Sequence, residues 1–317
     1  MGPNARGALL ALIAFGIFAT HDVVVKTLGG VYSPIQIIFF STLLSFPLVM
    51  FMLIRDQSRA TLQPVHPWWT LLRTACAVAT ALLAFYAFSV LPLAQTYAIL
   101  FAAPLLITVL AIPILGEPVR WRRGVAVLVG LAGVIVVLRP GVTDLTFGHL
   151  AALGAAIFGA TASVIVRKIG RDERSIVLLL YPMIASFILM AALLPAVYIP
   201  MPLEDLALVG VISALGFSAG LVLIGAYKRA EAAIVAPMQY SQILWATGYG
   251  YLLFGETIDR PTLIGAGIII ASGLYIVLRE GRTPGSQTPV LRTRARGYGS
   301  SFRISPFLNG SRDRPED

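Results

Sequence analysis

The sequence predicts an all-α membrane protein in which ten transmembrane helices form two inverted five-helix repeats (5+5). Its composition, an internal repeat and the placement of its positive charges lead to this fold class. Of 317 residues, 57% are hydrophobic and only 12% are charged, whereas soluble proteins carry about 25% charged residues. A soluble core cannot enclose so much apolar surface, so we expect a lipid bilayer to cover much of it.

The internal repeat has an offset of about 140 residues. A Gly-Glu pair at 116–117 returns at 255–256, and the Val-Leu-Arg segment at 137–139 returns at 277–279. An offset this constant predicts a tandem duplication. The expected units are 7–140, 147–279 and a disordered, basic cytoplasmic tail at 280–317.

Ten apolar segments are long enough for spans, which need about 20 residues each. They lie at about 7–28, 34–54, 68–90, 93–115 and 122–138 in the first repeat, and at about 147–168, 175–197, 204–226, 231–254 and 260–278 in the second. Backbone groups in hydrocarbon must be bonded internally, so continuous runs of this length predict helices. The first run exceeds a signal-peptide core, and we expect it to be an uncleaved span.

Positive charges fix the expected orientation. If the N-terminus is cytoplasmic, 15 of the 24 Lys and Arg residues fall on the inner side, and only Lys26, Arg139 and Arg260 fall outside. The remainder lie in the tail. This bias predicts that both termini face the cytoplasm, as in a multi-pass protein of the bacterial inner membrane. It also explains the net charge of +9 without a nucleic-acid partner.

An odd number of spans per repeat makes the two repeats enter the membrane from opposite faces. Inverted repeats are typical of secondary transporters, in which the substrate site lies near the midplane between the repeats. The alternative is a membrane protein that kept a duplication without transporting anything.

Asp22 is the one acidic residue well inside a predicted span. A charge at the bilayer centre costs about 2.5–3.5 kcal/mol on insertion scales, so its side chain should face the helix bundle and have a partner. One hypothesis places a substrate or proton site at His21 and Asp22. The other is a structural ion pair between Asp22 and Lys26, four residues further on and in the favourable order.

A second group of candidate site residues consists of aromatic and amide side chains within predicted spans. These residues are Tyr86, Gln95, Tyr97, Tyr181, Gln239, Tyr240, Gln242 and Trp245. Aromatic walls with a few placed polar groups suit a small planar or amphipathic metabolite. Hydrogen bonding between helices is the alternative role for each residue.

Small residues are spaced for close helix contact in the fifth and tenth spans, at Ala126 and Gly130 and at Gly267 and Ala271. We interpret them as packing residues, with a homodimer through these two helices as one form of that packing.

The sequence offers no convincing catalytic or cofactor motif, which argues against an enzyme. The segment 216–220 matches G-x-S-x-G, but it lies inside an apolar helix and not at the strand-to-helix turn that this motif requires. The sequence has no Walker A, GxGxxG or HExxH pattern. We therefore expect no catalytic residues, no metal and no cofactor.

The two Gly-Glu pairs end the fourth and ninth spans, and each is followed by a Gly-rich helix. With these features the chain resembles the ten-helix EamA branch of the drug/metabolite transporter superfamily. Segment 233–240, which leads to the second pair, and segment 18–20 with Asp22 and Lys26 resemble members that move S-adenosylmethionine or riboflavin.

The resemblance implies a central cavity, with the fifth and tenth helices set apart and often at a dimer contact. It also implies that Lys26, Glu117 and Glu256 belong to structural motifs of the family. Phe101 is the first-repeat equivalent of Tyr240, so the repeats differ where the pocket is expected.

The expected function is alternating-access transport of a small organic metabolite, such as S-adenosylmethionine, riboflavin or an amino acid. The alternatives are an exporter of amino acids or drugs and a membrane-embedded protein without transport activity.

Overall fold

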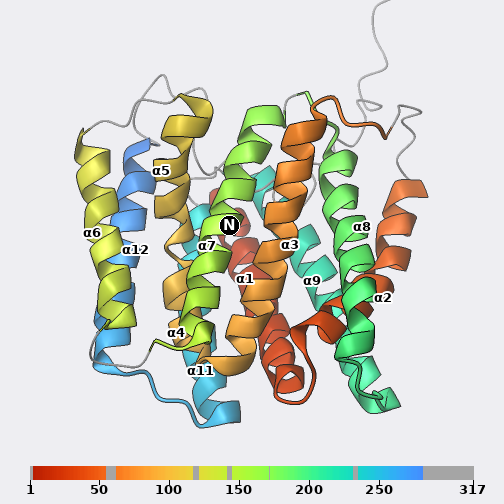
Figure 1. Ribbon diagram of the computed structural model, residues 1–317. Coiled ribbons are helices and arrows are strands. Elements are labelled where there is room, and N and C mark those ends of the chain that lie inside the picture. The colour runs from red at the N-terminus through yellow and green to blue at the C-terminus, as the bar shows by residue number, and fades with distance from the viewer. Residues whose placement is uncertain are drawn as a thin grey trace, which may run out of the picture.

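The computed structural model describes residues 3–54, 62–116, 121–140, 145–170, 172–230 and 235–280, and all of its elements in these ranges are helices (Figure 1). In the first half they are α1 (Pro3–Gly29), α2 (Pro34–Ile54), α3 (Pro67–Val90), α4 (Leu93–Leu100), α5 (Ala103–Leu115) and α6 (Trp121–Leu138). In the second half they are α7 (Phe147–Ile169), α8 (Ser175–Leu193), η1 (Leu194–Ala196), α9 (Leu203–Arg229), η2 (Ala236–Ser241), α11 (Gln242–Phe254) and α12 (Arg260–Glu280).

Six helical stretches in the described ranges have the length and apolar composition to cross a bilayer. They are Ala5–Gly29, Pro67–Val90, Leu93–Leu115, Val177–Ala196, Phe147–Ile169 and Leu203–Ala226, and shorter apolar helices occur at Pro34–Met50, Gly124–Leu138 and Arg260–Ile276. The all-helical class is therefore confirmed. Large apolar side chains on the outer surface, such as Trp68, Leu244 and Leu252, are at least 73% exposed, as lipid-facing residues are.

Two glycines of the repeat end equivalent helices. Gly116 follows α5 with φ of 70°, and Gly255 follows α11 with φ of 65°. This left-handed conformation suits glycine because it has no Cβ, and it is a common way to end a helix. The repeated Gly-Glu pair thus marks a helix end in both halves. Glu117, the acid of the first pair, lies outside the described residues.

Helix α1 crosses the middle of the molecule and packs along α9, while α3 packs along α7. Helices α6 and α12 lie side by side at one edge (Figure 1). Their contact depends on glycine, because a Cβ on Gly133 would lie 2.9 Å from the carbonyl oxygen of Gly265, and one on Gly265 would lie 2.6 Å from that of Gly133.

The predicted small residues divide between this contact and the outer surface. Ala126 is buried, and its carbonyl oxygen accepts a hydrogen bond from Ser272 of α12. A Cβ on Gly130 would collide with Leu105. Gly267 has no atom within 4 Å of a built Cβ, and Ala271 is exposed. Packing within the chain therefore accounts for the α6 pair, and the α12 pair faces outward.

Candidate functional site

Asp22 lies at the centre of a hydrogen-bonded group that we call the Asp22 cluster: His21, Asp22, Tyr97 and Gln242. His21 Nδ1 is 2.7 Å from Asp22 Oδ1. The hydroxyl of Tyr97 donates to the other carboxylate oxygen, and Gln242 Nε2 donates to the Tyr97 hydroxyl at 3.5 Å. The cluster joins α1 to α4 and α11 and brings together four of the predicted site residues.

The expected alternative for Asp22, an ion pair with Lys26, is wrong. Lys26 Nζ lies 2.8 Å from Glu256 Oε1 and donates to the carbonyl oxygen of Leu91 at 2.5 Å. The second oxygen of Glu256 accepts from the Leu93 backbone N–H at 2.9 Å. The favourable spacing on α1 does not produce the pair because each side chain has a closer partner on another element.

Glu256 therefore binds the start of α4 and a cation of α1 at once. A carboxylate is favoured at a helix N-terminus because the backbone N–H groups there lack partners within the helix. Lys26 also lies 5.3 Å from the centre of the Phe254 ring. The Gly-Glu pair of the second repeat thus ends α11 with its glycine and connects three segments with its acid.

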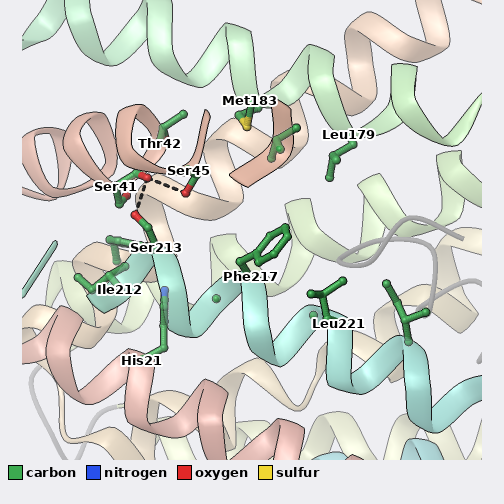
Figure 2. Close-up of a pocket in the computed structure, with 15 residues that line it drawn as sticks. His21, Ser41, Thr42, Ser45, Leu179, Met183, Ile212, Ser213, Phe217 and Leu221 are labelled. Atoms are coloured by element: carbon green, nitrogen blue, oxygen red, sulfur yellow. Dashed lines mark hydrogen bonds between the residues drawn. The ribbon is translucent and has the colours of Figure 1, made fainter. Parts of the chain in front are cut away.

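A cavity of about 250 Å³ lies beside the Asp22 cluster, between α1, α2, α3, α8 and α9 (Figure 2). It is lined by His21, Ser41, Thr42, Ser45, Val49, Phe85, Leu179, Met183, Ile212, Ser213, Gly216, Phe217, Gly220, Leu221 and Ile224. Of the predicted site residues, His21 is the one in this lining. Its side chain projects from α1 toward α9 in Figure 2.

The polar part of the wall is built around one carbonyl group. The carbonyl oxygen of Ser41 accepts from Ser45 Oγ and from Ser213 Oγ, each at 2.7 Å (Figure 2). Sequence reasoning missed these serines. A serine in an apolar helix usually bonds to its own helix backbone, so only the tertiary structure shows that these hydroxyls share a cavity.

Gly216 of α9 borders the imidazole of His21 in the cavity wall. A Cβ at this position would lie 3.6 Å from His21 Cδ2 and 3.8 Å from Nε2, which are ordinary van der Waals distances. The G-x-S-x-G segment at 216–220 lies within α9, as the sequence predicted, and two of its glycines line the cavity. An apolar wall with a few convergent polar groups is the usual form of a site for a small organic molecule.

A smaller hollow of about 190 Å³ lies by the α11–α12 connection and includes Gln95, Glu256 and Asp259. Gln95 Nε2 is 3.0 Å from His149 Nε2 of α7. Asp259 forms an ion pair with Arg139. Gln95 thus connects two helices, which is the alternative role that the sequence left open for such amides.

The remaining predicted residues do not converge on one pocket. Tyr181 is 36% exposed, and its hydroxyl donates to the carbonyl oxygen of Leu62 at 3.4 Å. Trp245 stacks on Tyr249 with ring centres 6.1 Å apart.

The other three lie in different surroundings. The ring of Tyr240 packs edge-on against Phe101 at 5.1 Å, which places the two repeat-equivalent aromatic residues in contact. Tyr86 packs against the main apolar core, and Gln239 is half-buried in η2. Within the described ranges, no group of three or more His, Cys, Asp or Glu residues is placed to hold a metal ion.

Comparison with known proteins gives consistent matches. The model of the EamA-like transporter family matches residues 5–139 and 146–278. The S-adenosylmethionine uptake transporter of Rickettsia bellii is 27% identical over 276 residues, which is 86% of this chain and 92% of the relative. The pseudopaline exporter CntI of Pseudomonas aeruginosa is 24% identical over 84% of this chain and 94% of the relative. A solved crystal structure shares the fold with a TM-score of 0.61 at 18% identity, covering 89% of this chain and all of the other.

Proposed function

Because the chain belongs to the EamA-like transporter family and is a multi-pass membrane transporter, we propose that it is a bacterial inner-membrane secondary transporter that moves a small organic metabolite by alternating access. The observation that carries this proposal is the cavity of about 250 Å³ between α1, α2, α3, α8 and α9. Its wall comes from both halves of the chain, as a site between two repeats requires.

The two five-span repeats, at 7–140 and 147–279, are part of the proposal. Two separate matches to one family model support it, and so do the left-handed glycines that end α5 and α11. In Figure 1 α5 ends at the upper edge of the molecule and α11 at the lower edge, as inverted repeats require. Reporter fusions at residues 120 and 258 test the inversion, which would be wrong if both reporters lay on the same side of the membrane.

We assign the substrate or proton site to His21 and Asp22. Asp22 is 15% exposed, and its described polar contacts, with His21 and Tyr97, include no lysine or arginine. Keeping such a carboxylate within a span is costly, which favours a role in function. His21 connects this carboxylate to the cavity, so protonation at the pair and binding in the cavity can influence each other.

The proposed substrates are S-adenosylmethionine, riboflavin or an amino acid, or a molecule similar to one of them. The Rickettsia relative favours S-adenosylmethionine uptake, whereas the Pseudomonas relative favours export as the second candidate function. The wall agrees with an amphipathic organic molecule, since Phe85, Phe217 and Met183 line it beside the serines. The relatives are named as transporters, which agrees with a role other than catalysis.

The test is flux in vesicles that contain the purified protein. Labelled S-adenosylmethionine, riboflavin and amino acids are offered on either side, with and without a proton gradient. We expect flux of one class above that of protein-free vesicles. Flux equal to that of protein-free vesicles for every compound, in both directions, would contradict the proposal.

Orientation and assembly complete the proposal: both termini are cytoplasmic, and two copies associate through α6 and α12. The outward-facing Gly267 and Ala271 of α12 support this association. Gly267→Leu should lower the fraction of dimer in detergent, whereas Gly248→Leu, at a glycine of α11 that also has open space, serves as the control.

A further inference from the structure

Side-chain contacts join the α1–α2 turn to the α8–α9 connection at one end of the helix bundle. The hydroxyl of Tyr32 donates to Asp205 Oδ2 at 2.6 Å. Gln36 Nε2 donates to the carbonyl oxygen of Ile199 at 2.7 Å, and the Ile199 N–H donates back to Gln36 Oε1 at 3.0 Å. Tyr32 and Gln36 are 4% and 0% exposed.

These contacts lie where α2 and α9 begin, since Tyr32 and Gln36 flank the start of α2 and Asp205 is in the first turn of α9. The cavity lining begins further along both helices, at Ser41 and Ile212, and continues toward the other end of the bundle. Val49 lines the cavity near the end of α2, Leu179 near the start of α8, and Ile224 near the end of α9. Ser41 and Ser213, which are hydrogen-bonded to each other, lie between the Tyr32 and Gln36 contacts and this part of the cavity.

The chemistry of these contacts suits a closure that forms and breaks. Each is a hydrogen bond whose net contribution is modest, because water satisfies the same groups once they separate. The bond to Asp205 raises the pKa of Tyr32, as expected for a phenol that donates to a carboxylate. Hydrogen bonds are directional, so they join the α1–α2 turn to the α8–α9 connection in one arrangement. Apolar packing alone would not.

We propose that Tyr32, Gln36, Asp205 and the Ile199 backbone form a latch that holds this end of the cavity shut, and that solute exchange on this side requires it to open. The proposal rests on the transport function proposed above and adds the residues that control access. By the charge bias of the loops, the latch lies on the outer side, and the part of the cavity lined by Val49 and Ile224 lies toward the cytoplasm.

Thiol labelling tests the latch without requiring transport. Cys76 is the single cysteine, so a Cys76→Ala background with Ser45→Cys carries one reactive group in the cavity wall. A membrane-impermeant maleimide is applied to right-side-out and to inverted vesicles. The latch variants are Tyr32→Phe and Gln36→Leu, and the matched control is Tyr198→Phe, which removes the hydroxyl of a half-exposed tyrosine at the same end.

In the parent we expect labelling from the cytoplasmic side and little from the outer side. Loss of one hydrogen bond to a carboxylate shifts a closed-to-open equilibrium by about tenfold or more, so Tyr32→Phe should raise labelling from the outer side by at least about that factor. Gln36→Leu, which removes two bonds, should raise it further, and Tyr198→Phe should leave it unchanged.

Outer-side labelling that stays at the parental level in Tyr32→Phe would overturn the latch, because that variant removes a single oxygen atom and should fold. Equal labelling of the parent from both sides, or labelling only after detergent is added, would also overturn it. A protein that labels as expected but moves no solute would refute the transport proposal and leave the latch intact.

Discussion

Asp22 and Lys26 lie one helical turn apart on α1, yet their surroundings differ in kind. Lys26 is 11% exposed and has a full set of fixed partners: the Glu256 carboxylate, the Leu91 carbonyl oxygen and the face of the Phe254 ring. Asp22 is 15% exposed, and its partners are a histidine that lines the cavity and a buried phenol. The charge of Lys26 is neutralised by a fixed ion pair. The charge of Asp22 is connected through His21 to the cavity where we expect substrate.

We interpret Lys26 as a charge that stabilises the fold and Asp22 as a charge that serves transport. The Lys26–Glu256 pair connects α1 to the start of α4 and to the end of α11, and such a pair is costly to break from one side. Asp22 is bonded instead to a histidine of the cavity wall and to a phenol. We therefore expect substitutions at Lys26 to lower stability and substitutions at Asp22 to lower transport.

The largest predicted effect is that of Lys26→Met. It leaves Glu256 as a charge without its cation, and removal of one partner from a largely buried pair costs roughly 3–5 kcal/mol. Thermal unfolding in detergent should show a marked drop in midpoint, with reduced yield of membrane protein. The double variant Lys26→Met/Glu256→Gln should recover part of the loss, because the amide oxygen still accepts from Leu93 N–H. A single variant as stable as the parent would show that the pair is not structural.

The next effect is on transport alone. Asp22→Asn keeps the shape of the side chain and an oxygen that accepts from Tyr97, but it removes the charge. Transport should be abolished. The free energy of unfolding, obtained from thermal unfolding, should change by no more than about 1 kcal/mol. Asp172→Asn serves as the matched control, because Asp172 is 61% exposed and pairs with His66 away from the cavity. Parental flux in Asp22→Asn would remove this residue from the mechanism.

The two residues also show what sequence can and cannot predict. Hydropathy predicted the helices, and the repeat predicted equivalent helix ends at Gly116 and Gly255, because both depend on local chemistry. The spacing of Asp22 and Lys26 favoured, as one of two alternatives, a pair that the structure does not contain. Spacing along a helix describes local neighbours only, whereas the partner of Lys26 is Glu256, 230 residues away in the sequence.

Most of the cavity lining escaped prediction for a related reason. Large aromatic and amide residues attract attention in an apolar sequence, but Tyr181, Tyr240 and Trp245 lie apart in the structure. The polar part of the wall is made instead of serines of α2 and α9, beside aliphatic and aromatic residues. Residues of these types occur throughout membrane helices, so only the packing of α2 on α9 distinguishes the ones that face the cavity.

The smallest predicted effect on transport tests how far the function of Asp22 depends on its phenolic partner, Tyr97. Tyr97→Phe removes the hydroxyl that donates to Asp22 and accepts from Gln242, while the ring keeps its contact with Phe88 at 5.2 Å. We expect slower transport than in the parent but more than in Asp22→Asn, because the carboxylate and His21 remain. The cost in stability should be about 1.5–3 kcal/mol, the value of one hydrogen bond to a charged group. Tyr181→Phe, which removes a phenol with a long contact at the surface, should match the parent in both measurements. If Tyr97→Phe and Tyr181→Phe behaved alike, the phenol would be a packing residue, and His21 alone would connect the charge of α1 to the cavity.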